Sequence, residues 1–328
     1  MTAEQILSAF PRLSALVVGD ICLDRWCAYD PALSEPSRET GIRRLAVVAT
    51  EVTPGAGGTV ANNLAALGAG RVAVLGAVGD DGHAYELLRA LAARGIDSSA
   101  LVHCATLATF TYTKLINSQT GREDQSRVDF VNPRPLPPEA EQAILERLPA
   151  LVEKADAVLI SDQAETEAGG VITPRVRALL AEQAQKHTGK IFWVDSRKRI
   201  AEFRHMILKP NQEEAEEACR SLGGLDYAAL RKHTLAPLLI VTCGPNGVLV
   251  VDPNGETWVK TQPVDNPVDI CGAGDSFSAG AAMALAAGAP PLEAARFGNL
   301  VASVTIMKKG TGTASPEEVL AAERNAAS

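Results

Sequence analysis

The stretch Asp269-Ile270-Cys271-Gly272-Ala273-Gly274-Asp275 decides which fold this chain is expected to have. An Ala-rich segment that favours a helix follows it to about Ala287, so the two glycines stand where a loop becomes a helix. Glycine lets the backbone approach a ligand closely, and the free N–H groups at a helix start suit a phosphate. We therefore expect an anion site at Gly272, Ala273 and Gly274.

Asp275 follows these glycines directly and falls in the first turn of the expected helix. A bound phosphate repels a carboxylate, so an aspartate here fits a residue that takes the proton from an attacking hydroxyl. The same aspartate also fits an N-cap on a buried Gly/Ala helix. The stretch alone leaves both interpretations open.

The stretch resembles the signature Asp-Thr-Thr-Gly-Ala-Gly-Asp of the ribokinase-like sugar kinases, also called the phosphofructokinase-B family. Ile270 and Cys271 replace the two threonines, whereas the glycines and both aspartates remain. The resemblance implies an α/β fold over residues 1–328, with a three-layer αβα core, a mostly parallel sheet and a small β-sheet lid. It also implies an ATP-dependent sugar kinase with Asp275 as the catalytic base and with Gly272, Ala273 and Gly274 holding charge on the transferring phosphoryl group.

Composition and charge narrow the classes of partner. The 328 residues are 46% hydrophobic and carry a net charge of −8 without a Lys/Arg block, which argues against nucleic acid or an anionic membrane surface as the main partner. Aromatic residues make up only 4%, so a base-stacking platform is not expected. No apolar run reaches transmembrane length, and the N-terminus has no basic segment typical of a signal peptide. We expect a cytoplasmic protein.

The cysteines point to the same compartment. Their spacing does not form the pair of pairs that binds zinc, so we expect buried free thiols in a reducing environment. The six residues are Cys22, Cys27, Cys104, Cys219, Cys243 and Cys271.

Short apolar runs alternate with helix-favouring segments along most of the chain, which predicts parallel βαβ units. Two polar, strand-like regions, 25–52 and 106–130, interrupt this alternation. They predict a small second sheet that acts as a lid. In the resembling family these segments cover the sugar and often form a dimer contact, so the resemblance implies a homodimer through the lid.

The expected acceptor site lies near the end of the first strand. Asp24 follows the apolar run 13–18, and ligands collect at the carboxyl ends of strands in α/β sheets, although a turn aspartate would also fit. The family holds sugar hydroxyls with such an aspartate and with a Gly-x-Gly-x-Asn segment before a helix. Here the matching residues are Gly55, Gly57, Gly58 and, at the asparagine position, Thr59.

The expected nucleotide site is spread over the second half of the chain. Asn211 and Glu214 match the Asn-x-x-Glu element with which the family positions Mg²⁺ and phosphate through water, but an Asn N-cap with an acidic first turn explains them equally. The segment 242–247 resembles the Thr-x-Gly-x-x-Gly element of the family. By resemblance, ATP lies against Thr242, Gly244, Gly247 and Asn299.

The resemblance further implies a monovalent cation, such as K⁺, beside the anion site. In many family members the carbonyls of a late loop bind it together with the first aspartate of the signature. In this chain the late loop is 309–313, and the site involves Asp269 and the carbonyl of Cys271.

Within the family, 161–166 resembles a segment of the heptose-7-phosphate kinases, which continue Ser-Asp-Tyr-x-Lys-Gly. Glu165 stands at the lysine position. A carboxylate there would repel a substrate phosphate, which favours a neutral sugar or sugar derivative as acceptor. A heptose-7-phosphate kinase, a nucleoside kinase and a non-catalytic sugar- or nucleotide-binding protein of the same fold remain the alternatives.

Overall fold

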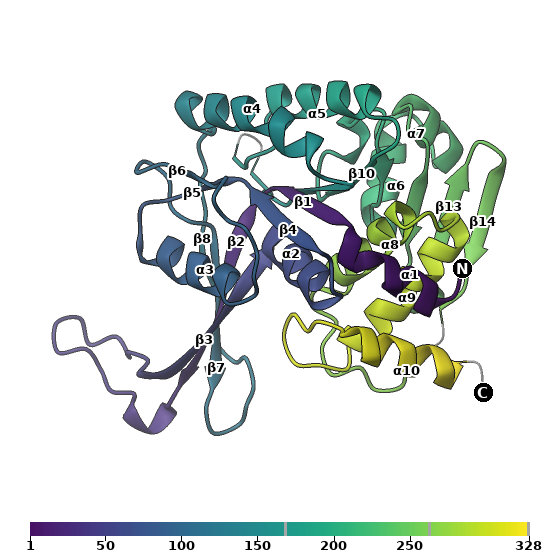
Figure 1. The fold of residues 1–328 in the computed structure, drawn as a ribbon. Helices are drawn as coiled ribbons and strands as arrows, with labels where there is room; N and C mark the ends of the chain where they lie inside the picture. Colours follow the sequence, from purple (N-terminus) through teal and green to yellow (C-terminus); the bar gives the residue numbers. More distant parts are fainter. Residues whose placement is uncertain (167–168, 262–263, 327–328) are drawn as a thin grey trace.

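The computed structural model describes residues 1–166, 169–261 and 264–326 (Figure 1). Its centre is an eight-stranded sheet in the order β14-β13-β12-β11-β10-β9-β1-β4. All neighbours from β4 to β12 pair in parallel, and β13 and β14 add an antiparallel hairpin at one edge. The mostly parallel sheet predicted from the sequence is therefore confirmed. The strands are β1 Ser14–Gly19, β4 Arg71–Leu75, β9 Ala157–Asp162, β10 Ile191–Ser196, β11 Ile207–Leu208, β12 Leu239–Thr242, β13 Val248–Asp252 and β14 Gly255–Val259.

Helices cover both faces of this sheet and give the predicted three layers (Figure 1). Successive strand residues point to opposite faces, so Val17 packs into one core and Val18 into the other. The first face is covered by α1 Ala3–Ala9, α2 Gly57–Ala66, α3 Gly82–Ala92, α8 Ala273–Ala286, α9 Pro291–Thr305 and α10 Pro316–Ala326. The second is covered by α4 Pro138–Glu153, α5 Pro174–Lys186, α6 Gln212–Ser221 and α7 Tyr227–His233.

A second, four-stranded sheet, called the small sheet below, projects from the core at the lower left of Figure 1. Its order is β3-β2-β7-β8, and its strands are β2 Ile21–Tyr29, β3 Val47–Ala56, β7 Thr111–Asn117 and β8 Val128–Phe130. Only Asp20 separates β1 from β2, so the chain passes directly from the large sheet into the small one. A short parallel pair, β5 Ala77–Val78 and β6 Val102–His103, completes the strands.

Asp24 does not lie in a turn, which was the alternative that the sequence left open. It lies inside β2, between Thr53 of β3 and Tyr112 of β7. Likewise, β3 runs on to Ala56 and α2 already begins at Gly57. The expected glycine loop is thus the end of a strand that continues directly into a helix.

The cysteine expectation is only partly right. All six thiols are free, and four of them are buried, but Cys243 is partly exposed and Cys271 is exposed. Cys271 belongs to the loop that precedes α8, which borders a cleft and therefore leaves its side chain accessible. In the part of the chain that the structure describes, none of the helices has the length and apolar character needed to cross a membrane.

Candidate active site

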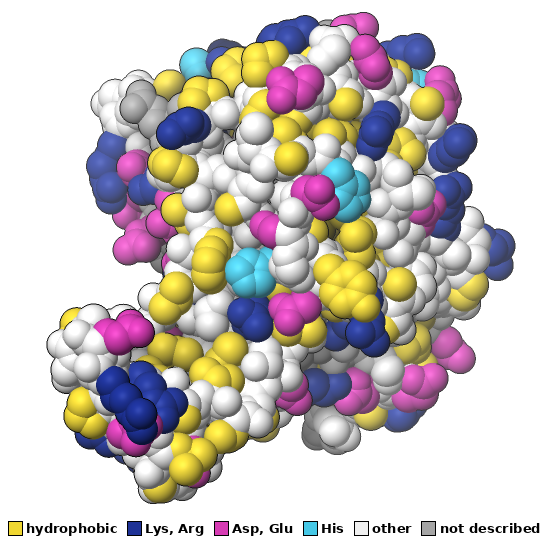
Figure 2. Space-filling model, turned by 90° about the vertical axis from the view of Figure 1, so that its left-hand side faces the viewer, with side chains coloured by type: hydrophobic (Ala, Val, Ile, Leu, Met, Phe, Trp, Pro, Cys, Tyr) yellow, Lys and Arg dark blue, Asp and Glu magenta, His cyan; other side chains and the backbone are white. Residues whose placement is uncertain are grey.

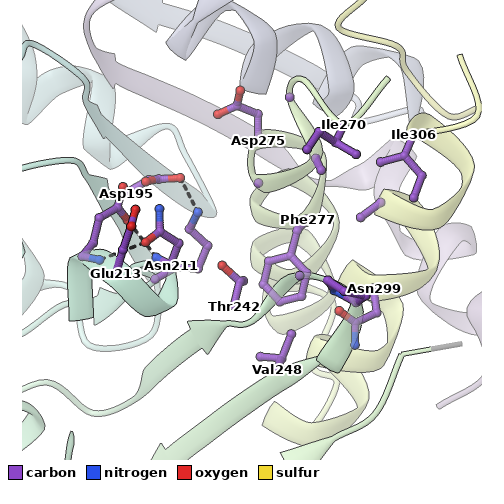
Figure 3. A pocket seen from close by; sticks show the side chains of 18 of the residues that line it. Asp195, Asn211, Glu213, Thr242, Val248, Ile270, Asp275, Phe277, Asn299 and Ile306 are labelled. Atoms are coloured by element: carbon purple, nitrogen blue, oxygen red, sulfur yellow. Dashed lines mark hydrogen bonds and ion pairs between the residues drawn. The ribbon is translucent and has the colours of Figure 1, made fainter. Parts of the chain in front are cut away.

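A cleft of about 1230 Å³ opens at the carboxyl ends of β10, β11 and β12, opposite the N-terminal end of α8 (Figure 3). This is the edge of a parallel sheet at which ligands collect. In Figure 3, Asp195, Asn211 and Glu213 lie on one side of the cleft, and Phe277 and Asn299 lie on the other. Asp275 lies above both groups. The cleft therefore has an apolar end at Phe277 and a strongly charged end at Asp195 and Asp275.

The glycines before α8 have the conformation that an anion site requires. Gly272 is the N-cap of α8 with φ of +79°, a left-handed conformation that glycine adopts without strain. A Cβ atom on Gly274 would lie 3.3 Å from the Nζ atom of Lys209, so the backbone here faces an ammonium group at close range. The amide of Ala273 donates to the carbonyl of Ile270 at 3.2 Å, which engages one of the three predicted phosphate donors inside the loop.

Asp275 lies in the first turn of α8, where its side chain remains partly accessible from the cleft. Burial raises the pKa of its carboxyl group to about 7, and the charges of Asp195 and Asp24 act in the same direction, whereas Lys209 and Arg197 oppose them. A general base is most effective when its pKa lies near the working pH. The surroundings therefore suit the role that the sequence suggested for Asp275.

A buried ion pair that the sequence analysis missed connects two strand ends in the cleft. The Nζ atom of Lys209 lies 2.5 Å from a carboxylate oxygen of Asp195, and only 3% of Lys209 is exposed. Burial alone would lower the pKa of Lys209, but Asp195 holds it above its ordinary value. Lys209 directly precedes the Asn-x-x-Glu element, and that proximity was the available signal.

Asn211 and Glu214 form a capping box at the start of α6. The side chain of Asn211 accepts from the amide of Glu214 at 2.9 Å, and the carboxylate of Glu214 accepts from the amide of Asn211 at 2.8 Å. The N-cap interpretation left open by the sequence is therefore what the structure shows. Both residues still line the cleft, and burial together with the charge of Asp195 raises the pKa of Glu214. Their role toward Mg²⁺ stays a prediction.

The predicted nucleotide residues lie around the apolar end of the same cleft. Gly247 has φ of +97°, and a Cβ atom on it would collide with the carbonyl of Val259. Among the atoms that the structure describes, the buried Nδ2 of Asn299 has no hydrogen-bond partner, so this amide can still donate to a ligand. The cleft wall here includes Thr242, Gly244, Gly247, Val248, Phe277 and Asn299.

The predicted acceptor residues lie on the small sheet and at the start of α2. A Cβ atom on Gly55 would collide with the carboxylate of Asp24, so this glycine gives Asp24 its space. Burial raises the pKa of Asp24 to about 6, and Lys114 and Arg127 oppose this rise. The buried hydroxyl of Thr59 donates to the carbonyl of Pro54 at 3.2 Å and so remains free only to accept.

The start of α2 also meets the anion site. A Cβ atom on Gly272 would lie 3.4 Å from the methyl group of Thr59 and 3.3 Å from that of Thr311. The amide of Gly57 donates to the carbonyl of Asp20 at 2.9 Å, and a Cβ atom on Gly58 would lie 2.6 Å from Pro54. These close approaches need small residues, so the glycines have a structural role as well as the predicted one.

Asp269 joins two loops at the edge of the anion site. Its carboxylate accepts from the amide of Cys271 at 2.9 Å and from the amide of Gly310 at 3.1 Å. The structure therefore brings Asp269, Cys271 and the late loop 309–313 together, as the predicted cation site requires. The binding of a cation there stays a prediction.

Glu165 is not the unpaired carboxylate that the sequence analysis assumed. It accepts from the Nη1 atom of Arg197 at 2.6 Å, and the Nε atom of the same arginine donates to Gln163 at 3.0 Å. The neighbouring cation compensates the charge of Glu165. The preference for a neutral acceptor, which the sequence analysis based on Glu165, stays a prediction.

Comparison with known proteins adds sequence relatives. The family described as pfkB family carbohydrate kinase matches residues 15–318. The chain is similar to the bifunctional protein HldE of Trichlorobacter lovleyi, with 30% identity over 98% of this chain and 66% of the relative. It is similar to that of Caulobacter sp. strain K31 as well, with 33% identity over 97% of this chain and 64% of the relative. The chain thus spans slightly less than two thirds of the length of these relatives.

Solved structures confirm the ribokinase-like fold. The ribokinase of Thermotoga maritima matches with a TM-score of 0.68 and 23% identity over 95% of this chain and 100% of that chain. Phosphofructokinase-2 of Escherichia coli in complex with potassium matches with a TM-score of 0.69 and 19% identity, over 96% of this chain and 100% of that chain. The ribokinase of Arabidopsis thaliana complexed with ribose and ATP matches with a TM-score of 0.67 and 19% identity, over 94% of this chain and 98% of that chain.

Proposed function

The chain belongs to the pfkB family of carbohydrate kinases, and on that premise we propose that it transfers the γ-phosphoryl group of ATP to a hydroxyl of a sugar or sugar derivative. The observation that carries the proposal is Asp275, a carboxyl group with a pKa of about 7 in the first turn of α8. It shares one cleft with the glycine backbone and with the buried pair Lys209–Asp195. The ATP complex of a structural neighbour is consistent with a nucleotide in such a cleft.

In the proposed reaction, the adenine lies at the apolar end of the cleft and the phosphates lie toward Lys209 and the start of α8. The acceptor lies between Asp24 and Asp275. Asp275 takes the proton of the attacking hydroxyl, a new O–P bond forms to the γ-phosphorus, and the bond to the β–γ bridging oxygen breaks, which releases ADP. Positioning and charge stabilisation supply most of the rate enhancement of such transfers.

A Mg²⁺ ion is expected to accompany ATP. Burial and, to a smaller extent, the charge of Asp195 raise the pKa of Glu214, and a hard, partly hydrated cation beside it would favour the charged carboxylate. Asp195 and Glu214, the latter through water, would hold the ion, which would neutralise charge on the phosphates when bound. Asn211 would fix the start of α6 through its capping box.

We propose that the small sheet acts as a lid over the acceptor and as a homodimer contact. In Figure 2 a lobe projects from the body of the molecule and carries apolar side chains next to a cluster of basic ones. Large apolar residues of the small sheet and its connecting loop are exposed, among them Ile42, Val47 and Val48. Exposed apolar surface of this kind marks interaction sites. Sedimentation of the protein over a range of concentrations tests the dimer, and a persistent monomer would contradict it.

The test of the function is a screen for ADP release from ATP with sugars, sugar phosphates and nucleosides as acceptors. A sugar or sugar derivative is expected to give turnover that depends on its presence. Turnover with nucleosides alone would favour a nucleoside kinase. If no acceptor of any class releases ADP, the chain binds its ligands without catalysis and the proposal fails.

We expect the rate to depend on a monovalent cation. The carboxylate of Asp269 draws together the turn at Cys271 and the late loop at Gly310, where backbone carbonyls and one carboxylate suit a hard cation. Phosphofructokinase-2 of E. coli, which shares the fold, has been crystallised with potassium. Activity should rise when K⁺ replaces tetramethylammonium at constant ionic strength. An unchanged rate would remove the cation from the mechanism.

The pKa of Asp275 predicts the pH dependence of catalysis. Below about 7 its carboxyl group is protonated and cannot accept a proton, so kcat/KM should rise with pH and level off above that value. Asp24 has a pKa of about 6, so the rate should fall more steeply below that pH, where Asp24 also loses the charge with which it accepts hydroxyl hydrogen bonds. Initial rates in buffers of constant ionic strength measure the profile. A rate that falls as the pH rises through 7 would exclude Asp275 as the base.

A further inference from the structure

The indole ring of Trp26 connects the small sheet to the late loop 309–313. A Cβ atom on Gly310 would lie 3.3 Å from the Cζ2 atom of Trp26 and within 3.8 Å of two further atoms of the ring, so the ring lies against the backbone of this glycine. Gly310 is buried and has a φ of +71°, a conformation in which a larger residue would be strained. In Figure 1 the loop between α9 and α10 extends toward the small sheet.

The late loop in turn holds the anion site in two places. The amide of Gly310 donates to the carboxylate of Asp269 at 3.1 Å, and the same carboxylate accepts from the amide of Cys271 at 2.9 Å. A Cβ atom on Gly272, the N-cap of α8, would lie 3.3 Å from the methyl group of Thr311. The loop therefore fixes both the turn before α8 and the first position of that helix.

The late loop is bonded within itself and to α10. The Nζ atom of Lys308 donates to the carbonyl of Thr313 at 2.6 Å and lies 2.7 Å from the carboxylate of Glu318. The amide of Gly312 donates to the carbonyl of Gly310 at 3.0 Å. Because these bonds make the loop a compact unit, a shift at Gly310 is transmitted along it to the residues that touch the anion site.

Trp26 stands on the same strand as the expected acceptor ligand. Asp24 precedes it by two residues in β2, and side chains two positions apart in a strand point to the same face. Trp26 is paired in register with Lys114 of β7. The charges of Lys114 and Asp24 act on the thiol of Cys271, which belongs to the turn before α8. This turn therefore lies near the face of the small sheet that carries Asp24 and Trp26.

We propose that Trp26 is a positioning residue for phosphoryl transfer: its indole ring seats the late loop, and through Asp269 and Thr311 the loop holds the start of α8 in place. The inference rests on the proposed kinase function for its kinetic consequence, and it adds that the anion site depends on the position of the small sheet. Because Asp24 and Trp26 share one strand, an acceptor that fixes this strand also fixes the loop. Such coupling favours transfer to the acceptor over transfer to water.

Amide hydrogen exchange tests the structural link without turnover. The amides of Gly310 and Cys271 both donate to Asp269, so their exchange reports directly on the link. In the protein without ATP or acceptor, at a constant K⁺ concentration, Trp26→Ala should raise the exchange rate of both amides by about tenfold, the size of a lost aromatic contact. Trp26→Phe keeps an aromatic ring and should retain part of the protection.

Trp258→Ala is the matched control, since Trp258 is 55% exposed and lies on the edge strand β14 of the large sheet. It should leave the exchange of Gly310 and Cys271 unchanged. Trp26→Leu, which also lacks the flat ring, should show the same rise as Trp26→Ala and replaces it if that variant does not fold. Faster exchange confined to β2, with the amides of Gly310 and Cys271 unchanged, would mean that Trp26 only packs the small sheet and would overturn the proposal.

The kinetic consequence is a loss of kcat with little change in KM. Trp26→Ala should lower kcat for the preferred acceptor by about 10–100-fold, the cost of misplacing a reacting group, while KM for ATP and for the acceptor changes less than about threefold. A raised KM for the acceptor with an unchanged kcat would show that Trp26 contacts the acceptor instead, and the proposal would fall. If no acceptor releases ADP, the kinase proposal fails, whereas the exchange of Gly310 and Cys271 still decides whether Trp26 holds the anion site.

Discussion

The variant Asp275→Asn is expected to lower kcat by about 10²–10⁴-fold or more while ATP binding is largely kept. The amide is nearly the same size as the carboxyl group but cannot take a proton from the acceptor. Its neighbours Lys209 and Asp195 keep their own ion pair, so the phosphate end of the cleft is preserved. Initial rates of ADP release measure kcat, and calorimetry with ADP measures nucleotide binding.

The matched control is Ser278→Ala, one turn further along α8. Its hydroxyl is buried and has no hydrogen-bond partner among the described residues, so its removal should change neither the rate nor the fold. A folded Asp275→Asn protein with near-normal turnover would show that another group takes the proton.

Thermal unfolding gives a second readout for Asp275→Asn. The pKa of Asp275 is raised in the fold from 3.8 to about 7, so the fold disfavours its charged form. The ionised group therefore lowers stability above pH 7, and this effect disappears when the pH falls below the unfolded value. We expect the variant to have a higher Tm than the wild type at pH 8 and a similar Tm near pH 4. A lower Tm at pH 8 would mean that the carboxylate is stabilised by an unrecognised partner.

The features that the sequence predicted well depend on neighbouring residues. The alternation of apolar runs and helices predicted the parallel sheet, and the segment 269–275 predicted the start of α8, because periodicity and glycine conformation are local properties. The family resemblance placed Asp275 and the nucleotide residues, and the structure gathers these around one cleft.

The features that the sequence did not predict depend on which strands become neighbours. Lys209 pairs with Asp195 because β10 and β11 are adjacent, and Arg197 reaches Glu165 because β10 also borders β9. No spacing along the chain encodes these pairs. The sequence shows that Glu165 carries a charge. It does not show that Arg197 pairs with it, because that pair depends on the adjacency of β9 and β10. The position of Asp24 inside a strand was not predicted, because β2 begins only two residues after the end of β1.

The second large effect is expected for Gly274→Val, which should lower kcat/KM by at least about 10²-fold, the loss caused by removing one preorganised donor from a charged transition state. A Cβ atom at this position lies 3.3 Å from the Nζ atom of Lys209, and the further methyl groups of valine would fill the space where backbone must meet phosphate. Substrate phosphates would then be pushed away from both the helix start and the ammonium group.

The fold of Gly274→Val should survive, because outside its own helix and chain neighbours the added Cβ meets, among the described residues, just the end of the Lys209 side chain within 4 Å. The control is Gly82→Val at the first position of α3, where an added Cβ meets no described atom within 4 Å outside its own helix and chain neighbours. Both variants are measured by Tm and by kcat/KM, and only Gly274→Val should lose activity. An active Gly274→Val protein would show that phosphate does not approach this backbone. An unfolded one would show that the glycine is needed for packing, and either result would move the phosphate site away from the start of α8.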